Sequence, residues 1–284
     1  MKKIISLVLA LLMIGTLAIA SASCAKTLPN VIGVQTGTTG QYYVDGDADW
    51  GFDGINGFTS KGYNNGGLAV QDMKNGNVKY VIIDEQPAKQ LAKKMDVKVI
   101  DVALTEEEYA FGVDKNQPEL LASINAILAE MKTNGKLDEI VTAYATGEGI
   151  KPFESGSFEA AKADKQLVVA TNAAFAPFEY KDGDKFAGID MEIAAYIAAE
   201  LELELVIVDM DFDSVVTSVG KNGVDIAMAG LTVNEKRKEY VTFTTSYYNA
   251  AQMLIVPKNV TAFDNCKTAA DVLAVLAKDV EAAK

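Results

Sequence analysis

The stretch from Gln166 to Leu201, QLVVATNAAFAPFEYKDGDKFAGIDMEIAAYIAAEL, carries the clearest structural pattern in the chain. Its first residues, Gln166 to Ala170, form a short apolar run that is typical of a buried strand. After Gly188, apolar residues recur every four positions, at Ile189, Ile193, Ile197 and Leu201. This spacing predicts one buried face of a helix. A strand followed by such a helix indicates a βα unit on a largely parallel sheet.

The same alternation continues downstream of this unit. Leu205 to Val208 is predicted to be the next strand, and Val224 to Ala229 the one after it. Between them, Asp213 is a predicted N-cap for a short helix that carries Val216 and Val219, and Gly223 would end that helix. The region after Lys165 is therefore predicted to form one α/β lobe.

The first half of the chain repeats the pattern. A strand is predicted around Val31 to Val34, a helix over Ala69 to Asn75, and a second strand over Tyr80 to Ile83. Two further amphipathic helices are indicated by apolar residues at 120, 124, 127, 128 and 131 and at 137, 140, 141 and 144. Residues 147–164 lose this periodicity and have the Gly, Pro, Ser and charged composition of a surface linker. We therefore expect a second α/β lobe.

Composition limits the classes of function. With 284 residues and 49% apolar side chains, the chain can fill two hydrophobic cores. A net charge of −13 disfavours nucleic acid as a partner. Histidine is absent, which excludes Ser-His-Asp and Cys-His nucleophiles and imidazole-ligated metals. Cys24 and Cys266 are too few for a disulfide scaffold or a thiolate cluster, so no metal site and no cofactor are expected.

The N-terminus has the pattern of an export signal. Lys2 and Lys3 precede an apolar run from Ile4 to Ala20, and small residues then lead into Cys24. Residues 1–24 are therefore excluded from the fold. Cys24 is a candidate for lipidation, with simple cleavage after Ala22 or nearby as the alternative. Both fates place the protein outside the cytoplasm, either anchored to the membrane at the cell surface or soluble in the periplasm or medium.

Several motifs in the second half together resemble a known family. They are QLVVATNAAFAPFEY (166–180), FAGIDMEIAAYIAAEL (186–201), DMDFDSVV (209–216), GVDIAMAGLTVNEKRKEYVTFTTSYY (223–248) and MLIV (253–256). In this order and spacing they resemble the first lobe of the polar amino-acid-binding proteins of ABC transporters, bacterial solute-binding proteins of family 3. The resemblance implies an α/β fold of the type II periplasmic-binding-protein kind: two lobes that close like a flytrap about a two-strand hinge.

The remaining matches lie upstream, where the family would place them downstream. They are VIGVQTGTTGQYY from Val31, YVIIDEQPAKQL from Tyr80 and NGKLDEIVTAYATGEG from Asn134. We therefore expect a circularly permuted chain. Lobe one would span about residues 112–256, including the 147–164 linker that joins the ancestral termini. Lobe two would combine residues 28–108 and 258–284, and residues 108–112 and 252–256 would form the hinge. A misassembled reading frame is the alternative.

The resemblance also implies a binding site for an α-amino acid. Arg237, in TVNEKRKEY, matches the arginine that grips the ligand carboxylate, for which its planar fork provides two parallel donors. Asp84, in VIIDEQP, matches the carboxylate that accepts the ligand ammonium, at the end of a predicted strand. Without the motif, Arg237 would be a solvated helix residue and Asp84 a loop cap.

Other residues are assigned to the site by the same resemblance. The backbone at Ala229 and Gly230 with the hydroxyl of Thr232, and Thr38 and Thr39 of the opposite lobe, would complete the polar contacts. Phe175 and Phe212 would form aromatic walls, although either would also suit a core. Asn172 stands where binders of cationic amino acids often carry Asp, and Gln35 is expected to face the ligand side chain. A polar, uncharged ligand such as glutamine is therefore expected.

The predicted function is capture of a polar L-amino acid for an ABC importer, by a monomeric binding protein that is not an enzyme. The expected partners are the amino acid, the transporter permease and, if Cys24 is lipidated, the membrane. Two alternatives remain open: an exported dehydratase-like enzyme on the same fold, and the ligand sensor of a receptor. Turnover of a cyclic acid would favour the enzyme, and a separate signalling partner would favour the sensor.

Overall fold

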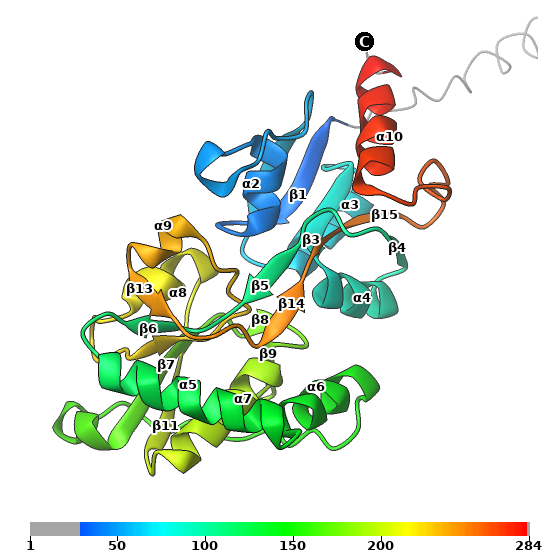
Figure 1. Cartoon of the computed structure of the whole chain (residues 1–284). Helices are drawn as coiled ribbons and strands as arrows, with labels where there is room; N and C mark the ends of the chain where they lie inside the picture. Colours follow the sequence, from blue (N-terminus) through cyan, green and yellow to red (C-terminus); the bar gives the residue numbers. More distant parts are fainter. Residues whose placement is uncertain (1–28, 283–284) are drawn as a thin grey trace, which may run out of the picture.

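The computed structural model describes residues 29–282, so the predicted export signal and Cys24 lie outside the described residues. Two five-stranded sheets, each with helices on both faces, are joined by a pair of short strands (Figure 1). This confirms the predicted α/β class with two lobes. Within residues 29–282, no helix combines the length and apolar character needed to cross a bilayer.

Lobe two contains the first sheet. Its strand order is β2 (Thr59–Tyr63), β1 (Val31–Gln35), β3 (Tyr80–Asp84), β15 (Gln252–Pro257) and β4 (Val97–Ile100). The pairs β1–β2 and β1–β3 are parallel, whereas β15 runs antiparallel to both β3 and β4. A strand from near the C-terminus therefore completes a sheet that the N-terminal residues begin.

Alternation along β3 explains why both faces of this sheet are covered. Tyr80 and Ile82 pack in the core beneath α2 (Thr39–Asp45) and α10 (Ala269–Ala282). Val81 and Ile83 face the other way, into the core beneath α3 (Gly66–Lys74) and α4 (Glu85–Lys94). Because successive side chains of a strand point to opposite faces, the apolar run YVII supplies both cores.

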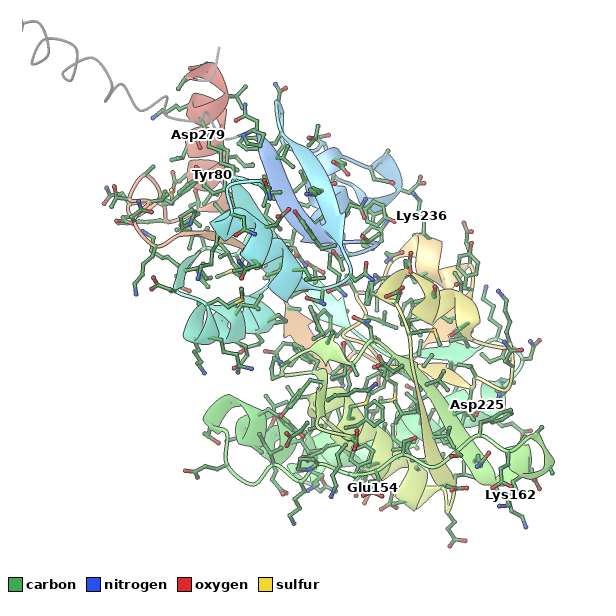
Figure 2. All side chains as sticks on the ribbon, turned by 180° about the vertical axis from the view of Figure 1, so that it is seen from behind. Tyr80, Glu154, Lys162, Asp225, Lys236 and Asp279 are labelled. Carbon is green, nitrogen blue, oxygen red and sulfur yellow. The ribbon has the colours of Figure 1, made fainter. Side chains whose placement is uncertain are left out.

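The C-terminal helix is tied to the N-terminal half by specific contacts. The hydroxyl of Tyr80 donates a hydrogen bond to Asp279 of α10 over 2.5 Å, and Lys79 forms an ion pair with the same carboxylate at 3.2 Å. Figure 2 shows Tyr80 beside Asp279 at the outer end of lobe two. Segments from the N-terminal half and the helix α10 thus build one lobe.

Lobe one contains the second sheet. Its order is β11 (Glu204–Asp209), β7 (Gln166–Thr171), β12 (Ile226–Ala227), β6 (Gly112–Asp114) and β13 (Val241–Phe243). Its helices are α5 (Pro118–Thr133), α6 (Lys136–Thr146), α7 (Ile189–Glu200), α8 (Phe212–Ser218) and α9 (Glu235–Lys238). A small sheet of β10 (Lys185–Ala187), β9 (Glu179–Asp182) and β8 (Ala174–Phe175) lies at its side, and η2 (Ala160–Lys165) is a 3-10 turn before β7. A second 3-10 turn, η1 (Ala48–Trp50), lies in lobe two.

Most predicted elements of lobe one are confirmed, with three corrections. The end predicted at Gly223 for the short helix is wrong, because α8 ends at Ser218 and Val219 is its C-cap. The predicted N-cap Asp213 is wrong: Asp211 is the N-cap of α8 and Asp213 lies in its first turn, because the Ser214 amide donates to the Asp211 carbonyl. The strand predicted over 224–229 is shorter, because the Val224 amide closes a turn onto Lys221. The helix after Gly188 buries Ile189, Ile193 and Ile197 as expected.

Two strands cross between the lobes. β5 (Glu107–Tyr109) pairs antiparallel with β14 (Tyr248–Ala250) in a sheet of their own. Residues 252–256, which were predicted to cross, instead lie in the lobe-two sheet as β15, between β3 and β4. After each crossing the chain inserts an antiparallel strand into the lobe it enters, β6 in one and β15 in the other. Both sheets therefore have the same arrangement.

Residues 147–164 run along the edge of the lobe-one sheet. The Gly156 amide donates to the Leu205 carbonyl over 2.9 Å, and the Ile207 amide donates to the Ser155 hydroxyl over 2.7 Å. β11 is the edge strand of this sheet, and these bonds occupy backbone groups that could otherwise pair with a strand of another chain. The predicted linker has little regular structure and nevertheless covers a sheet edge.

Candidate ligand-binding site

A small cavity of about 10 Å3 lies between the closed lobes, and eight predicted site residues line it. Lobe two contributes Thr38, Thr39 and Asp84; lobe one contributes Phe175, Phe212, Gly230, Thr232 and Arg237. The structure thus brings together side chains that are up to about 200 positions apart in sequence. The structure shows that the eight residues line the same cavity, and the role of each in binding a ligand remains a prediction.

Arg237 lies on α9 and is buried, with 8% of its surface exposed. Asn234 caps this helix by accepting a hydrogen bond from the Arg237 amide. The guanidinium donates to the Thr232 carbonyl over 2.8 Å and to the Gly37 carbonyl of lobe two over 3.3 Å. Burial lowers the Arg237 pKa to about 10, which leaves the group cationic at neutral pH. Among residues 29–282, no carboxylate forms an ion pair with it.

Asp84 ends β3 and is 5% exposed. Its Oδ2 accepts hydrogen bonds from the Tyr109 hydroxyl over 2.6 Å and from the side-chain amide of Gln252 over 2.8 Å. Burial and, next, the nearby Glu107 raise the Asp84 pKa to about 8, although its hydrogen bonds oppose this shift. A cation placed beside Asp84 would favour the ionised form.

Glu107 of β5 is a buried carboxylate that sequence reasoning missed. It accepts hydrogen bonds from Thr232 over 2.5 Å, from Thr105 over 2.6 Å and from the Gln252 side chain over 3.0 Å. The bond to Thr232 connects the crossing strand β5 to a residue that lines the cavity. The run EEEY around it has the composition of a solvated surface, so only the three-dimensional pairing of β5 identifies Glu107.

The threonines link the two lobes. The Thr39 hydroxyl donates to the Thr232 hydroxyl over 3.2 Å, and the latter donates onward to Glu107. Thr38 occupies the N-cap position of α2, but its hydroxyl donates to the Gln35 carbonyl and does not cap the helix. Gly40 allows α2 to pack closely on the lobe-two sheet, because a Cβ there would lie 2.9 Å from Gln252 Oε1 and 3.2 Å from the Ile82 carbonyl.

Gly230 has a conformation that favours glycine. Its φ is +53°, and a Cβ would lie 2.9 Å from the Phe175 ring. Its amide donates to Asp190 over 2.9 Å, and Asp190 also accepts from the Tyr247 hydroxyl over 2.5 Å. Because the amide is engaged, the Gly230 carbonyl is the group left to meet a ligand. Burial raises the Asp190 pKa to about 7.

Three predicted residues do not line this cavity. Ala229 is fully buried in the core beneath α8. Gln35 and Asn172 are both buried and bond to each other across the cleft, from Gln35 Nε2 to Asn172 Oδ1 over 2.9 Å. Asn172 also donates to the Met210 carbonyl, whereas Gln35 Oε1 is buried without a partner among the described residues. The two amides thus link lobe two directly to lobe one.

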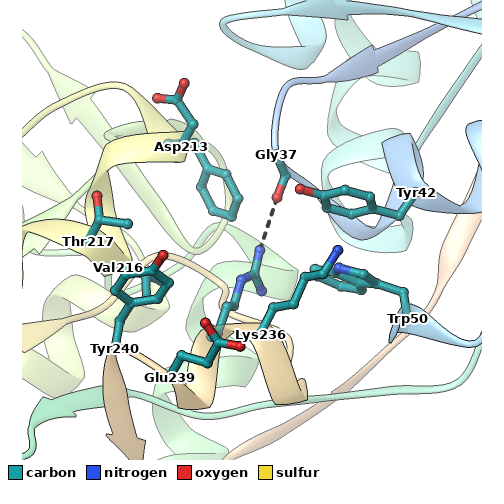
Figure 3. Close-up of a pocket in the computed structure, with 11 residues that line it drawn as sticks. Gly37, Tyr42, Trp50, Asp213, Val216, Thr217, Lys236, Glu239 and Tyr240 are labelled. Atoms are coloured by element: carbon teal, nitrogen blue, oxygen red, sulfur yellow. Dashed lines mark hydrogen bonds between the residues drawn. The ribbon is translucent and has the colours of Figure 1, made fainter. Parts of the chain in front are cut away.

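A second, more open pocket adjoins the cavity on the far side of Arg237 (Figure 3). It shares Phe212 and Arg237 with the cavity and adds Tyr42, Trp50 and Lys236. The aromatic rings of Phe212 and Trp50 each lie 5.3 Å from the guanidinium carbon. Sequence reasoning did not identify Trp50, because the segment around it has only the composition of a loop.

Residues 167–282 match the sequence model of the bacterial extracellular solute-binding proteins, family 3. This part of the chain is similar to that family. Its relatives include the arginine-binding extracellular protein ArtP of Bacillus subtilis, which is 38% identical over 34% of this chain and 37% of that protein. The histidine-binding periplasmic protein of Salmonella typhimurium is 27% identical over 38% of this chain and 42% of that protein. The chain thus spans about two fifths of the curated relatives it matches.

Among solved structures, the chain is similar to the arginine-bound form of domain 1 from TmArgBP. The identity is 29%, the match covers 43% of this chain and 99% of that one, and the TM-score is 0.28. The family match begins at β7 and ends in α10, so it takes in lobe one from β7 onward and the C-terminal part of lobe two.

Proposed function

We propose that the protein is the extracytoplasmic binding protein of an ABC importer and that it captures a polar L-amino acid by closing its lobes. The observation that carries the proposal is that Arg237 and Asp84, a buried cation and a buried carboxyl group from different lobes, line one cavity without forming an ion pair with each other. An α-amino acid carries the complementary charges on a single carbon. A buried charge is costly unless it is paired, so the ligand would stabilise both side chains.

Binding follows from these positions. The ligand carboxylate would accept hydrogen bonds from the Arg237 fork, and its ammonium would donate to Asp84, the Gly230 carbonyl and Thr232. Charge-assisted hydrogen bonds contribute roughly 1.5 to 3 kcal/mol each. A few of them, with contact to Phe175 and Phe212, account for the roughly 8 kcal/mol of micromolar binding. Since the contacts come from both lobes, the ligand favours the closed state.

The side-chain end of the site supports an uncharged polar ligand such as glutamine. Two amides, Gln35 and Asn172, meet there, and the free Oε1 of Gln35 is an acceptor that a ligand amide could satisfy. The named relatives bind arginine or histidine, which keeps cationic amino acids as the second candidate class. An arginine side chain would also donate to Gln35, but it would find no carboxylate at position 172.

We further propose that the chain is circularly permuted relative to the family. Two structural features support this order: β15 and α10 from the C-terminal end complete the sheet and core that β1 to β4 begin, and residues 147–164 bridge from α6 to β7 along a sheet edge. Lobe two would then comprise residues 28–108 and about 252–284, and lobe one about 112–247. The crossings would lie at β5 and β14.

The remaining assignments are part of the same proposal. Residues 1–24 direct export and Cys24 carries a lipid that holds the protein at the membrane, next to a permease that receives the amino acid. The names of the relatives, extracellular and periplasmic, support a location outside the cytoplasm. The proposed protein acts as a monomer and performs no chemistry on its ligand.

A thermal-shift screen of the purified protein against each free amino acid tests this function. A ligand that binds only the native state stabilises it by mass action and so raises Tm. The free energy of unfolding increases by about 2.7 kcal/mol at a ligand concentration 100 times Kd. We expect L-glutamine to give the largest shift and D-glutamine to give none. Turnover of a cyclic acid substrate, with no amino acid raising Tm, would instead support the enzyme alternative.

A further inference from the structure

The turn formed by residues 47–50 of lobe two, here called the Trp50 turn, packs against α9 of lobe one. Asp47 caps it by accepting a hydrogen bond from the Asp49 amide over 2.9 Å, and the Trp50 amide donates to the Asp47 carbonyl. Gly51, with φ of +74°, ends the turn. These local bonds hold the turn in one shape, so it presents its side chains to α9 as a unit.

Two ion pairs join the Trp50 turn to α9. The ammonium of Lys236 lies 2.8 Å from Asp47 Oδ2 and 3.2 Å from Asp49 Oδ2. The Lys236 side chain is 40% exposed, and Figure 3 shows it extending toward the Trp50 turn. Each pair is individually weak because water screens it. Their importance is geometric, since both lie one residue away from Arg237 and both cross between the lobes.

Trp50 contacts Arg237 itself. The indole stacks on Tyr42 of α2 with ring centroids 4.5 Å apart and 19° between planes, which fixes its orientation. The ring centre lies 5.3 Å from the Arg237 guanidinium carbon, and Phe212 of lobe one lies at the same distance. A guanidinium near two aromatic rings is attracted to both, and the attraction strengthens when water is excluded.

We propose that the Trp50 turn is a latch between the lobes, in which Trp50 positions Arg237 for the ligand carboxylate and the Lys236 ion pairs hold the turn on α9. The latch rests on the proposed function, because it concerns the same carboxylate-binding arginine. Lobe two supplies Trp50 and lobe one supplies Arg237, so the contact exists only while the lobes are closed. The latch therefore stabilises the closed, ligand-bound state and slows ligand release.

The test measures binding of L-glutamine and L-arginine as probes by calorimetry, with the full chain and with Trp50→Leu, Trp50→Phe and Lys236→Met. We expect Trp50→Leu to weaken binding about tenfold and Trp50→Phe, which keeps an aromatic face, about threefold or less. Lys236→Met keeps the aliphatic stem, and we expect a loss of about threefold. Lys238→Met is the control, because Lys238 lies on the same helix and, among residues 29–282, forms an ion pair only with Glu235.

A kinetic readout separates a latch from a general folding defect. Trp50 is the single tryptophan of the chain, so in Lys236→Met its fluorescence reports closure directly in stopped-flow experiments. If the turn is a latch, the ligand should dissociate faster from Lys236→Met than from the unsubstituted protein. The association rate and the number of binding sites per chain should stay the same. A partly unfolded variant would instead lose sites without a change in dissociation rate. If Trp50→Leu does not fold, Lys236→Met alone decides.

The outcomes distinguish the two proposals. If the unsubstituted protein binds a probe, and Lys236→Met releases it at the unsubstituted rate or folded Trp50→Leu binds it with the unsubstituted Kd, the latch is wrong and the binding function stands. If neither these probes nor any other amino acid binds the unsubstituted protein, the proposed function fails, and the latch fails with it because it has no ligand to retain.

Discussion

The side-chain amide of Gln35 in lobe two donates a hydrogen bond to the side-chain oxygen of Asn172 in lobe one, with 2.9 Å between Nε2 and Oδ1. This contact closes the cleft with an amide pair and no charge. It stands at the end of the site where the ligand side chain is proposed to lie. The proposed site would therefore select against charged side chains, because neither amide can neutralise a buried ion.

Asn172→Asp should move the preference toward cationic amino acids. A carboxylate there could pair with a guanidinium or ammonium, so the ratio of arginine to glutamine affinity should rise about tenfold or more. The variant also loses the donor that now bonds to the Met210 carbonyl, and we expect a lower Tm without ligand. Calorimetry with both amino acids checks this, and an unchanged ratio would show that position 172 does not face the ligand side chain.

Arg237→Ala should abolish tight binding. The bound carboxylate would stay buried without its partner, which costs about 3 kcal/mol or more, or at least about 100-fold in Kd. Arg237→Lys should recover only part of this, because an ammonium lacks the two parallel donors of the fork. Lys238→Ala on the same helix is the matched control and should bind normally. Equal calorimetric affinities for Arg237→Ala and this control would show that Arg237 does not bind the ligand carboxylate.

Ligand binding should release a proton from Asp84. The pKa of this group is raised to about 8 in the closed protein without ligand, so below pH 8 it is mostly neutral. The ammonium of the ligand favours the ionised form, so affinity should rise with pH by up to about tenfold per unit and level off above pH 8. Calorimetry at pH 6.5 in phosphate and in bis-Tris, two buffers with different ionisation enthalpies, should give different heats that correspond to up to one proton released.

Asp84→Asn is the control for this linkage. The amide keeps the shape but does not titrate, so binding should be weaker and its heat should not depend on the buffer. Proton uptake by the unsubstituted protein, or an affinity that does not change between pH 6 and pH 8, would contradict the role of Asp84 as the ammonium partner.

Restoring the family order should preserve the protein. A chain in which residues 166–284 are followed by 29–146 keeps every element of both sheets and removes only the linker and the N-terminal segment. We expect its Kd to lie within about threefold of the original, because native contacts do not depend on which surface connection is cut. A chain opened between Leu254 and Ile255, inside β15, should fail to fold. If the first chain is unfolded, the permutation proposal is wrong.

The predictable part of the fold follows from periodicity. The four-residue repeat of Ile189, Ile193 and Ile197 identifies α7, and the run YVII identifies β3, because burial alone sets those patterns. The crossing point was misplaced for a physical reason. The run MLIV has the same apolar character whether it crosses between lobes or lies in a sheet, and only its pairing with β3 and β4 decides.

The predictable part of the site follows from the motifs. Arg237 and Asp84 were identified from their sequence neighbourhoods, and the structure places both at one cavity. Glu107 and Trp50 were not identified, because each acts through partners distant in sequence: Thr232 and Gln252 for Glu107, and Arg237 for Trp50. No local pattern distinguishes a buried glutamate in an acidic run, or a tryptophan in a loop, from its solvated equivalent.

Isothermal titration of the purified chain with L-glutamine, L-arginine and the remaining amino acids measures the central claim directly. The account predicts one saturable site per chain with a Kd of about micromolar or tighter for a polar amino acid, and loss of that site in Arg237→Ala. Saturable heat from no amino acid, at protein concentrations that would detect millimolar binding, would contradict it.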